Sequence, residues 1–102
     1  MAHKVVFRRR AEARLTELYD YIAEQSSPRI AIEYIRRIRT TCFALSDFPE
    51  RGTRRDDVLP GLRTIGFERR VTIAFRVLKT RVEIVSIAYG GRDFERELRQ
   101  RK

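Results

Sequence analysis

The sequence has very few of the side chains that bind metals or form disulfides. It contains one cysteine, Cys42, and one histidine, His3, in 102 residues. A single cysteine excludes an internal disulfide, and the usual zinc spacings cannot be assembled from one cysteine and one histidine. No Gly-rich phosphate loop or nucleophile elbow is present either. We therefore expect no metal ion and no cofactor.

Long apolar runs are also missing. The segment 1–10 has only Val5-Val6-Phe7 before three arginines, which predicts neither a signal peptide nor a membrane span. Together with the single cysteine, this favours a reducing cytoplasm. The 42% of apolar residues suffice for one modest core, and the length is typical of one domain. The prediction is a single domain over residues 1–102.

The charge is strongly of one sign. Lysine and arginine number 23 against 14 aspartate and glutamate, a net charge of +9. The resulting positive field favours acidic partners, namely nucleic acid, an acidic protein surface or an anionic membrane. Charge alone does not choose among the three.

The first half of the chain predicts a strand and a helical hairpin. Residues 3–8 are rich in β-branched and aromatic types and too short for a helix, which indicates a strand. Apolar residues then recur every three or four positions over 9–24 and 28–47, as in amphipathic helices. Ser26-Ser27-Pro28 separates the two, because serine caps helices and proline suits a first turn. The apolar face expected for the second helix contains Ala31, Tyr34, Ile35, Ile38, Cys42, Leu45 and Phe48.

The second half predicts a loop, three strands and a tail helix. Residues 49–62 combine proline, glycine and aspartate without periodicity, which indicates a loop with a turn at Pro60-Gly61. Strands are expected over 63–67, 71–77 and 82–89, the last of them between two neighbours. After Gly90-Gly91, Asp93 is the expected cap of a short helix. The predicted fold class is α+β, with a three-stranded antiparallel meander packed on the helical hairpin.

Several spaced motifs resemble those of ParE-type toxins in the RelE/ParE superfamily of toxin–antitoxin proteins. The resemblance covers about residues 3–95 and implies the RelE/ParE-like fold. One departure is Gly-Gly-Arg-Asp after the last strand, where the family usually has a Gly-Arg-Arg-Asp-like ending. The motifs are Ala11–Glu24, Ala31 with Tyr34-Ile35, Leu45–Gly52, Pro60–Arg63 and Ile84–Asp93.

This resemblance implies a function as well as a fold. ParE-type toxins poison DNA gyrase, and a cognate ParD-like antitoxin neutralises them by wrapping along the toxin. The resemblance thus implies a toxin that inhibits gyrase by binding, held in a hetero-oligomer with its antitoxin. An acidic, partly disordered antitoxin that folds on binding also suits the positive charge of this chain.

The RelE branch offers an alternative, because it shares the fold but cleaves messenger RNA on the ribosome. That chemistry needs cations and an acid or base gathered around a phosphate. The likeness to the ribonucleases places Arg63 at one basic position. Thr72 and Gly90 stand where two further basic residues are expected, and Arg96 stands in place of a tyrosine. These departures favour the gyrase inhibitor over the enzyme.

The best candidates for functional side chains are Arg63, Arg76, Tyr89 and Arg92, because they lie at strand ends or just after a strand. For each arginine a solvated surface charge is an equally good interpretation in so basic a chain. For Tyr89 the simpler interpretation is a ring packed at the edge of the core. A third function, a nucleic-acid-binding module without catalysis, is also compatible with the net charge.

Overall fold

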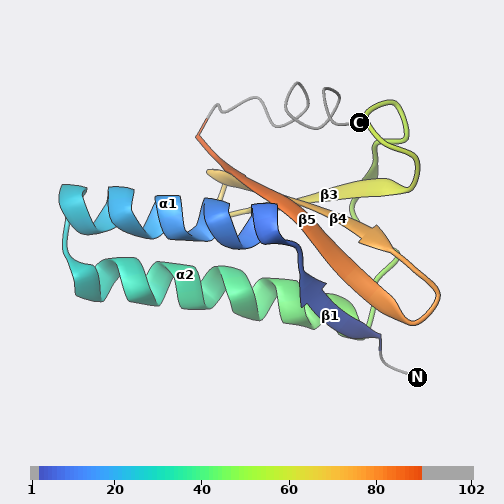
Figure 1. The fold of residues 1–102 in the computed structure, drawn as a ribbon, viewed down its shortest axis with the longest axis horizontal. Coiled ribbons are helices and arrows are strands. Elements are labelled where there is room, and N and C mark those ends of the chain that lie inside the picture. The colour runs from blue at the N-terminus through green and yellow to red at the C-terminus, as the bar shows by residue number, and fades with distance from the viewer. Residues whose placement is uncertain (1–2, 91–102) are drawn as a thin grey trace.

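The chain folds into two layers, a helical hairpin and a mixed β-sheet (Figure 1). The computed structural model describes residues 3–90. In chain order the elements are β1 (Lys4–Phe7), α1 (Arg9–Gln25), α2 (Pro28–Phe43), the 3-10 turn η1 (Ala44–Ser46), β2 (Thr53–Arg54), β3 (Leu62–Phe67), β4 (Val71–Val77) and β5 (Arg81–Tyr89). This confirms the predicted α+β class.

The helical hairpin forms as the sequence predicts. Ser27 begins α2, its hydroxyl accepting the backbone N–H of Ile30 at 3.2 Å, and Pro28 occupies the first turn. This cap satisfies one of the N–H groups that a helix leaves open at its start. Each helix buries one stripe, and α1 contacts both α2 and β5. The buried residues are Ala11, Leu15 and Leu18 of α1 and Ala31, Ile38 and Cys42 of α2.

The five strands lie in the order β1-β5-β4-β3-β2. Strands β3, β4 and β5 form the predicted antiparallel meander, and β1 pairs with β5 in parallel. Strand β5 therefore has a neighbour on each side, which confirms the prediction made from its apolar composition. The alternating residues Val71, Ile73 and Phe75 of β4 face the helices and form the main core with them.

The largest differences from the prediction lie in the loop before β3 and at the end of α2. Residues 49–62 are not all loop, because Thr53–Arg54 forms the two-residue strand β2 on the edge of β3, and β3 begins at Leu62. A strand this short has no periodicity to detect. The second helix ends at Phe43 instead of 47 and continues as η1. Phe48 was expected on the apolar face of that helix but lies beyond it, 74% exposed.

Gly52 determines how the chain approaches β3. It adopts a positive φ of +84°, and a Cβ at this position would lie 2.3 Å from the carbonyl oxygen of Thr64. Only glycine allows both the backbone conformation and this close approach. Gly52 thus positions β2 directly beside β3.

The predicted tail helix after Asp93 lies outside the described residues. Over residues 3–90, neither helix has the length and apolar character needed to cross a membrane.

Candidate functional site

A row of side chains crosses the sheet on the face that the helices cover. Residues directly opposite one another in paired strands share a face. The pairings Phe7 with Ile84, Ile84 with Phe75, Phe75 with Arg63 and Arg63 with Arg54 therefore form one continuous row. Ile84 and Phe75 are fully buried in the core. The row thus begins as core under the helices and ends in two arginines at the β2 edge.

These two residues and Arg51 form what we call the arginine edge (Arg51, Arg54 and Arg63). The Nη1 group of Arg63 donates to the Arg51 carbonyl oxygen at 3.5 Å. Arg54 and Arg63 lie directly opposite each other, an arrangement that like charges destabilise. The pairing of β2 with β3, which Gly52 makes possible, therefore keeps these arginines close together despite the repulsion between their charges.

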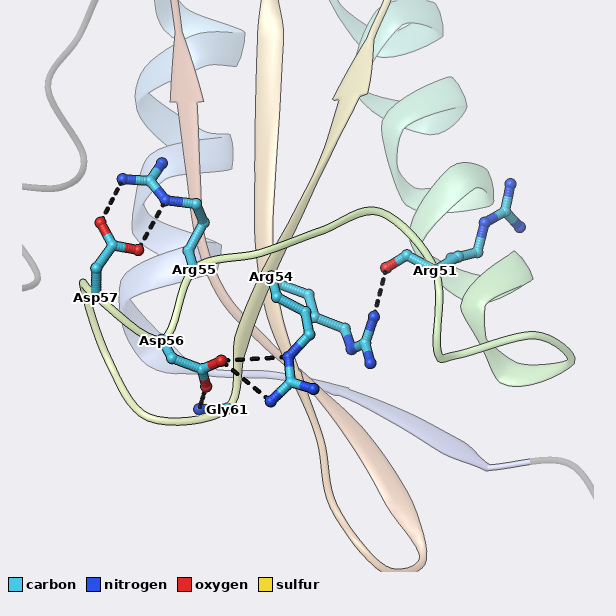
Figure 2. Close-up of polar contacts among 7 residues, drawn as sticks. Arg51, Arg54, Arg55, Asp56, Asp57 and Gly61 are labelled. Atoms are coloured by element: carbon cyan, nitrogen blue, oxygen red, sulfur yellow. Dashed lines mark hydrogen bonds and ion pairs between the residues drawn. The ribbon is translucent and has the colours of Figure 1, made fainter.

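Asp56 is the acidic partner of the arginine edge (Figure 2). Its Oδ2 lies 3.0 Å from Nη2 of Arg54, and its Oδ1 accepts the Gly61 N–H at 2.8 Å. The Gly61 N–H foremost, and then Arg54, hold the pKa of the Asp56 carboxyl below its usual value. Farther along the same loop, Arg55 and Asp57 form a separate ion pair at 3.0 Å. The Asp56 carboxylate thus contacts one of the three guanidinium groups of the arginine edge, that of Arg54.

Arg76 belongs to a different environment from Arg63. It lies opposite Leu62 and Glu83, on the sheet face turned away from the helices. Glu83 also contacts Arg8 at 3.6 Å and Arg81 at 3.4 Å. The positive charge of Arg76 therefore has a carboxylate as its cross-strand neighbour. Its Nε is buried and has no hydrogen-bond partner among the described residues.

Tyr89 lies at the opposite end of the sheet, in what we call the tyrosine end (Tyr21, Tyr34 and Tyr89). The ring centroid of Tyr89 is 5.7 Å from that of Tyr21 and 6.4 Å from that of Tyr34. Tyr34 also meets Phe67 edge-on at 5.6 Å. The ring of Tyr89 thus packs at the margin of the core, as the simpler interpretation predicts.

An ion pair closes the tyrosine end. Arg37 bonds both carboxylate oxygens of Glu68, at 3.1 and 3.2 Å, and its guanidinium lies 5.2 Å from the centre of the Tyr34 ring. Burial, and then the nearby Glu68 carboxylate, raises the pKa of the Tyr34 hydroxyl. This phenol therefore stays protonated at neutral pH and is not poised to act as a base.

A pocket of about 340 Å³ opens beside this end. Arg14, Glu17 and Tyr21 of α1 line it, together with Tyr89 and Gly90 from the end of the sheet. Arg14 and Glu17 form an ion pair at 3.0 Å within it. The pocket is amphipathic, and its charged groups neutralise each other.

The structure does not bring the predicted candidates together. Arg63 and Arg76 lie on opposite faces of the sheet. Arg63 is level with Ile84 of β5, five positions from Tyr89, which is roughly 17 Å along the strand. Arg92 lies outside the described residues. The three described candidates therefore cannot act on one phosphate.

Sequence reasoning missed several residues of these two surfaces. Arg51 and Arg54 were predicted to lie in a loop and were not named as candidates, although Arg51-Gly-Thr-Arg-Arg is visibly dense in arginine. Tyr34 was predicted on the apolar face of the second helix without a connection to Tyr89, and Tyr21 was not singled out. Cys42 lies in the core as predicted, and burial raises the pKa of its thiol to about 12. Among residues 3–90 no three metal-ligating side chains cluster.

Two comparisons with known proteins agree with this architecture. The family model described as the ParE toxin of the type II toxin–antitoxin system parDE matches residues 5–94. A solved structure titled "Chromosomal ParDE TA system from P. aeruginosa" is similar with a TM-score of 0.76 and 26% sequence identity, over 87% of this chain and 97% of that one. Among curated proteins no match was found.

Proposed function

The chain belongs to the ParE toxin family of type II toxin–antitoxin systems, and on that premise we propose that it inhibits DNA gyrase by binding. The observation that carries the proposal is the family match over residues 5–94, nearly the whole chain. The inhibitor acts in the cytoplasm, where gyrase and its DNA are found.

The arrangement of the charged side chains supports an inhibitor over the alternative, a ribosome-dependent ribonuclease. RNA cleavage requires cations and a proton-transfer group within reach of one phosphate. Arg63 and Arg76 face opposite sides of the sheet, and Tyr89 is far from both. Among residues 3–90 the geometry favours a protein that acts by contact.

The proposed neutralising partner is a ParD-like antitoxin. The large exposed apolar side chains of the described chain all lie on the hairpin or just after it, and each is about half exposed or more: Tyr21, Ile30, Ile32, Phe43 and Phe48. Such residues are the usual anchors of a peptide that folds on a partner's surface. We propose that an acidic antitoxin segment covers them, forming a hetero-oligomer.

Induction of the toxin alone tests the target. We expect growth arrest with a DNA-damage response and no discrete cuts in translated transcripts by primer extension. Ribosome-dependent cuts that disappear in Arg63→Gln and persist in Arg29→Gln would support the ribonuclease instead. Arg29 is a suitable control because it is an exposed arginine of α2.

Co-expression with the neighbouring reading frame tests the partner. We expect the two chains to elute together in size-exclusion chromatography with light scattering. The double variant Ile30→Ser/Ile32→Ser should weaken this complex, whereas Lys79→Gln, an exposed substitution in the turn between β4 and β5, should not. A toxin that elutes alone would contradict the proposed antitoxin.

A further inference from the structure

Among residues 3–90, the arginine edge carries three guanidinium groups, and the carboxylate that contacts it is that of Asp56. Arg54 and Arg63 are cross-strand neighbours, so their Cβ atoms lie roughly 5 Å apart. Arg51 adjoins them through its carbonyl oxygen, which accepts from Arg63. Asp56 shares its carboxylate between Arg54 and the Gly61 N–H. A second anion placed between Arg54 and Arg63 would relieve the repulsion that the fold imposes.

Arginine is well suited to such an anion when the anion is a phosphate. The planar guanidinium presents several N–H donors in one plane, which match the oxygens of phosphate. The hydrogen bond from Arg63 to the Arg51 carbonyl fixes one donor and orients the rest of the group. Gly52 and the Asp56–Gly61 contact hold the loop in place. The donors are therefore positioned before a ligand arrives.

The surface around the arginine edge distinguishes a nucleic acid from an acidic protein. A protein segment that folds on binding needs apolar anchors. Within residues 3–90 the large exposed apolar side chains lie on the hairpin and at Phe48, none of them on β2 or β3. Residues 51–54 are exposed and polar or glycine throughout. Interfaces with nucleic acid are polar and strongly positive in this way.

We infer that the arginine edge is a nucleic-acid contact, in which Arg51, Arg54 and Arg63 bind the phosphate backbone of duplex DNA without reading its sequence. Arg76 takes no part, because it faces the other side of the sheet and lies opposite Glu83. The inference does not depend on gyrase. It assigns to the toxin a direct DNA affinity of its own, located at one edge of the sheet.

The test is binding of the full chain to a fluorescent DNA duplex of random sequence, followed by fluorescence anisotropy over a range of salt concentrations. The test variant is Arg54→Gln/Arg63→Gln. The matched control is Arg29→Gln/Arg36→Gln, which removes the same charge from exposed positions of α2. Glutamine has a helix propensity close to that of arginine, so the control preserves α2.

We expect the test variant to lose affinity about tenfold or more at low salt, and the slope of log affinity against log salt to decrease by about 2. The control should lose much less. Equal losses in both variants would overturn the proposal, because the affinity would then come from the diffuse net charge. Thermal unfolding of both variants checks that they are folded.

The same assay distinguishes DNA from an acidic protein as the ligand of the arginine edge. A polyglutamate peptide is added to the wild-type chain and to both variants as the competing ligand. If the test variant loses its affinity for polyglutamate but keeps its affinity for DNA, the edge is a protein contact and the inference is wrong. Because the assay contains no gyrase, its failure leaves the proposed target untouched, and a failed gyrase assay leaves the DNA contact untouched.

Discussion

The arginine edge and the tyrosine end lie at opposite ends of the same sheet and satisfy their charges in opposite ways. At the tyrosine end Arg37 meets Glu68 with two hydrogen bonds and covers the ring of Tyr34. At the arginine edge Arg54 lies opposite Arg63, and Asp56 is the acidic group that contacts Arg54. One end is therefore closed by internal contacts, whereas the other, among residues 3–90, has more guanidinium groups than carboxylates.

Backbone strain, in contrast, is found at the tyrosine end. Glu68 and Arg69, in the turn between β3 and β4, both have positive φ angles of +49° and +62°. Arg70 closes the turn by donating its N–H to the Phe67 carbonyl at 3.2 Å, as in a type I′ turn. Side chains other than glycine, asparagine and aspartate rarely adopt this conformation. The tyrosine end thus combines a strained backbone with paired charges. The arginine edge combines charges that repel each other with a loop whose positive φ angle is taken by a glycine.

The largest expected effect comes from a core residue that lies next to the arginine edge. Phe75 is fully buried in the row that ends at Arg63. Phe75→Ala should lower the free energy of unfolding by about 3–5 kcal/mol, because it leaves a cavity. Urea denaturation measures this, with Phe75→Leu as the control that preserves most of the volume and costs less than about 1.5 kcal/mol. A loss below the control would show that the row is not part of the core.

The strained turn provides the next largest effect. Arg69→Gly should raise the free energy of unfolding by about 1 kcal/mol, because relief of the left-handed conformation exceeds the entropic cost of glycine. Lys79→Gly in the turn between β4 and β5 is the control, since Lys79 has no positive φ angle. That variant should lose stability. A similar change in both variants would contradict the strain at Glu68 and Arg69.

Removal of the negative charge of Asp56 should increase the excess of positive charge at the arginine edge. Asp56→Asn keeps an oxygen for the Gly61 N–H but removes the charge beside Arg54. DNA affinity should rise by up to about fivefold, the equivalent of one solvent-screened charge contact. Asp57→Asn removes the same charge from the pair with Arg55 and should have the smaller effect. Anisotropy with the same duplex measures both.

The smallest effect tests the repulsion directly. Arg63→Gln should raise the free energy of unfolding by about 0.5 kcal/mol at low salt, because it separates two like charges. The gain should shrink as salt is added. Arg76→Gln should have the opposite sign, since Arg76 lies opposite Glu83. If both variants change stability in the same direction, the two arginines do not occupy contrasting environments.

Much of this architecture was predictable from local patterns. The alternation of Val71, Ile73 and Phe75 identified the core face of β4, and Ser27-Pro28 identified the start of α2. The same alternation places Arg76 on the face opposite to that of Phe75. Arg76 was therefore a poor candidate to act together with residues on the helix-covered face. Local sequence patterns therefore predict the helices and strands and the faces that they turn to the core.

The functional surfaces depend on register, which local pattern does not contain. That Arg54 lies opposite Arg63 follows from a two-residue strand positioned by Gly52. That Tyr89 meets Tyr21 and Tyr34 follows from the packing of the hairpin on the sheet. The positive φ angles of Glu68 and Arg69 could not be predicted, because no glycine occupies either position. These features arise between segments distant in sequence, and only the folded chain brings them together.

Supercoiling by purified gyrase is the most direct measurement of the proposed function. The relaxed plasmid, ATP and gyrase are held constant while the toxin is titrated, alone and after mixing with its antitoxin. We expect supercoiling to fall as toxin is added and to recover when the antitoxin is present. Full supercoiling at every toxin concentration, from a preparation that still arrests growth when induced, would contradict gyrase as the target.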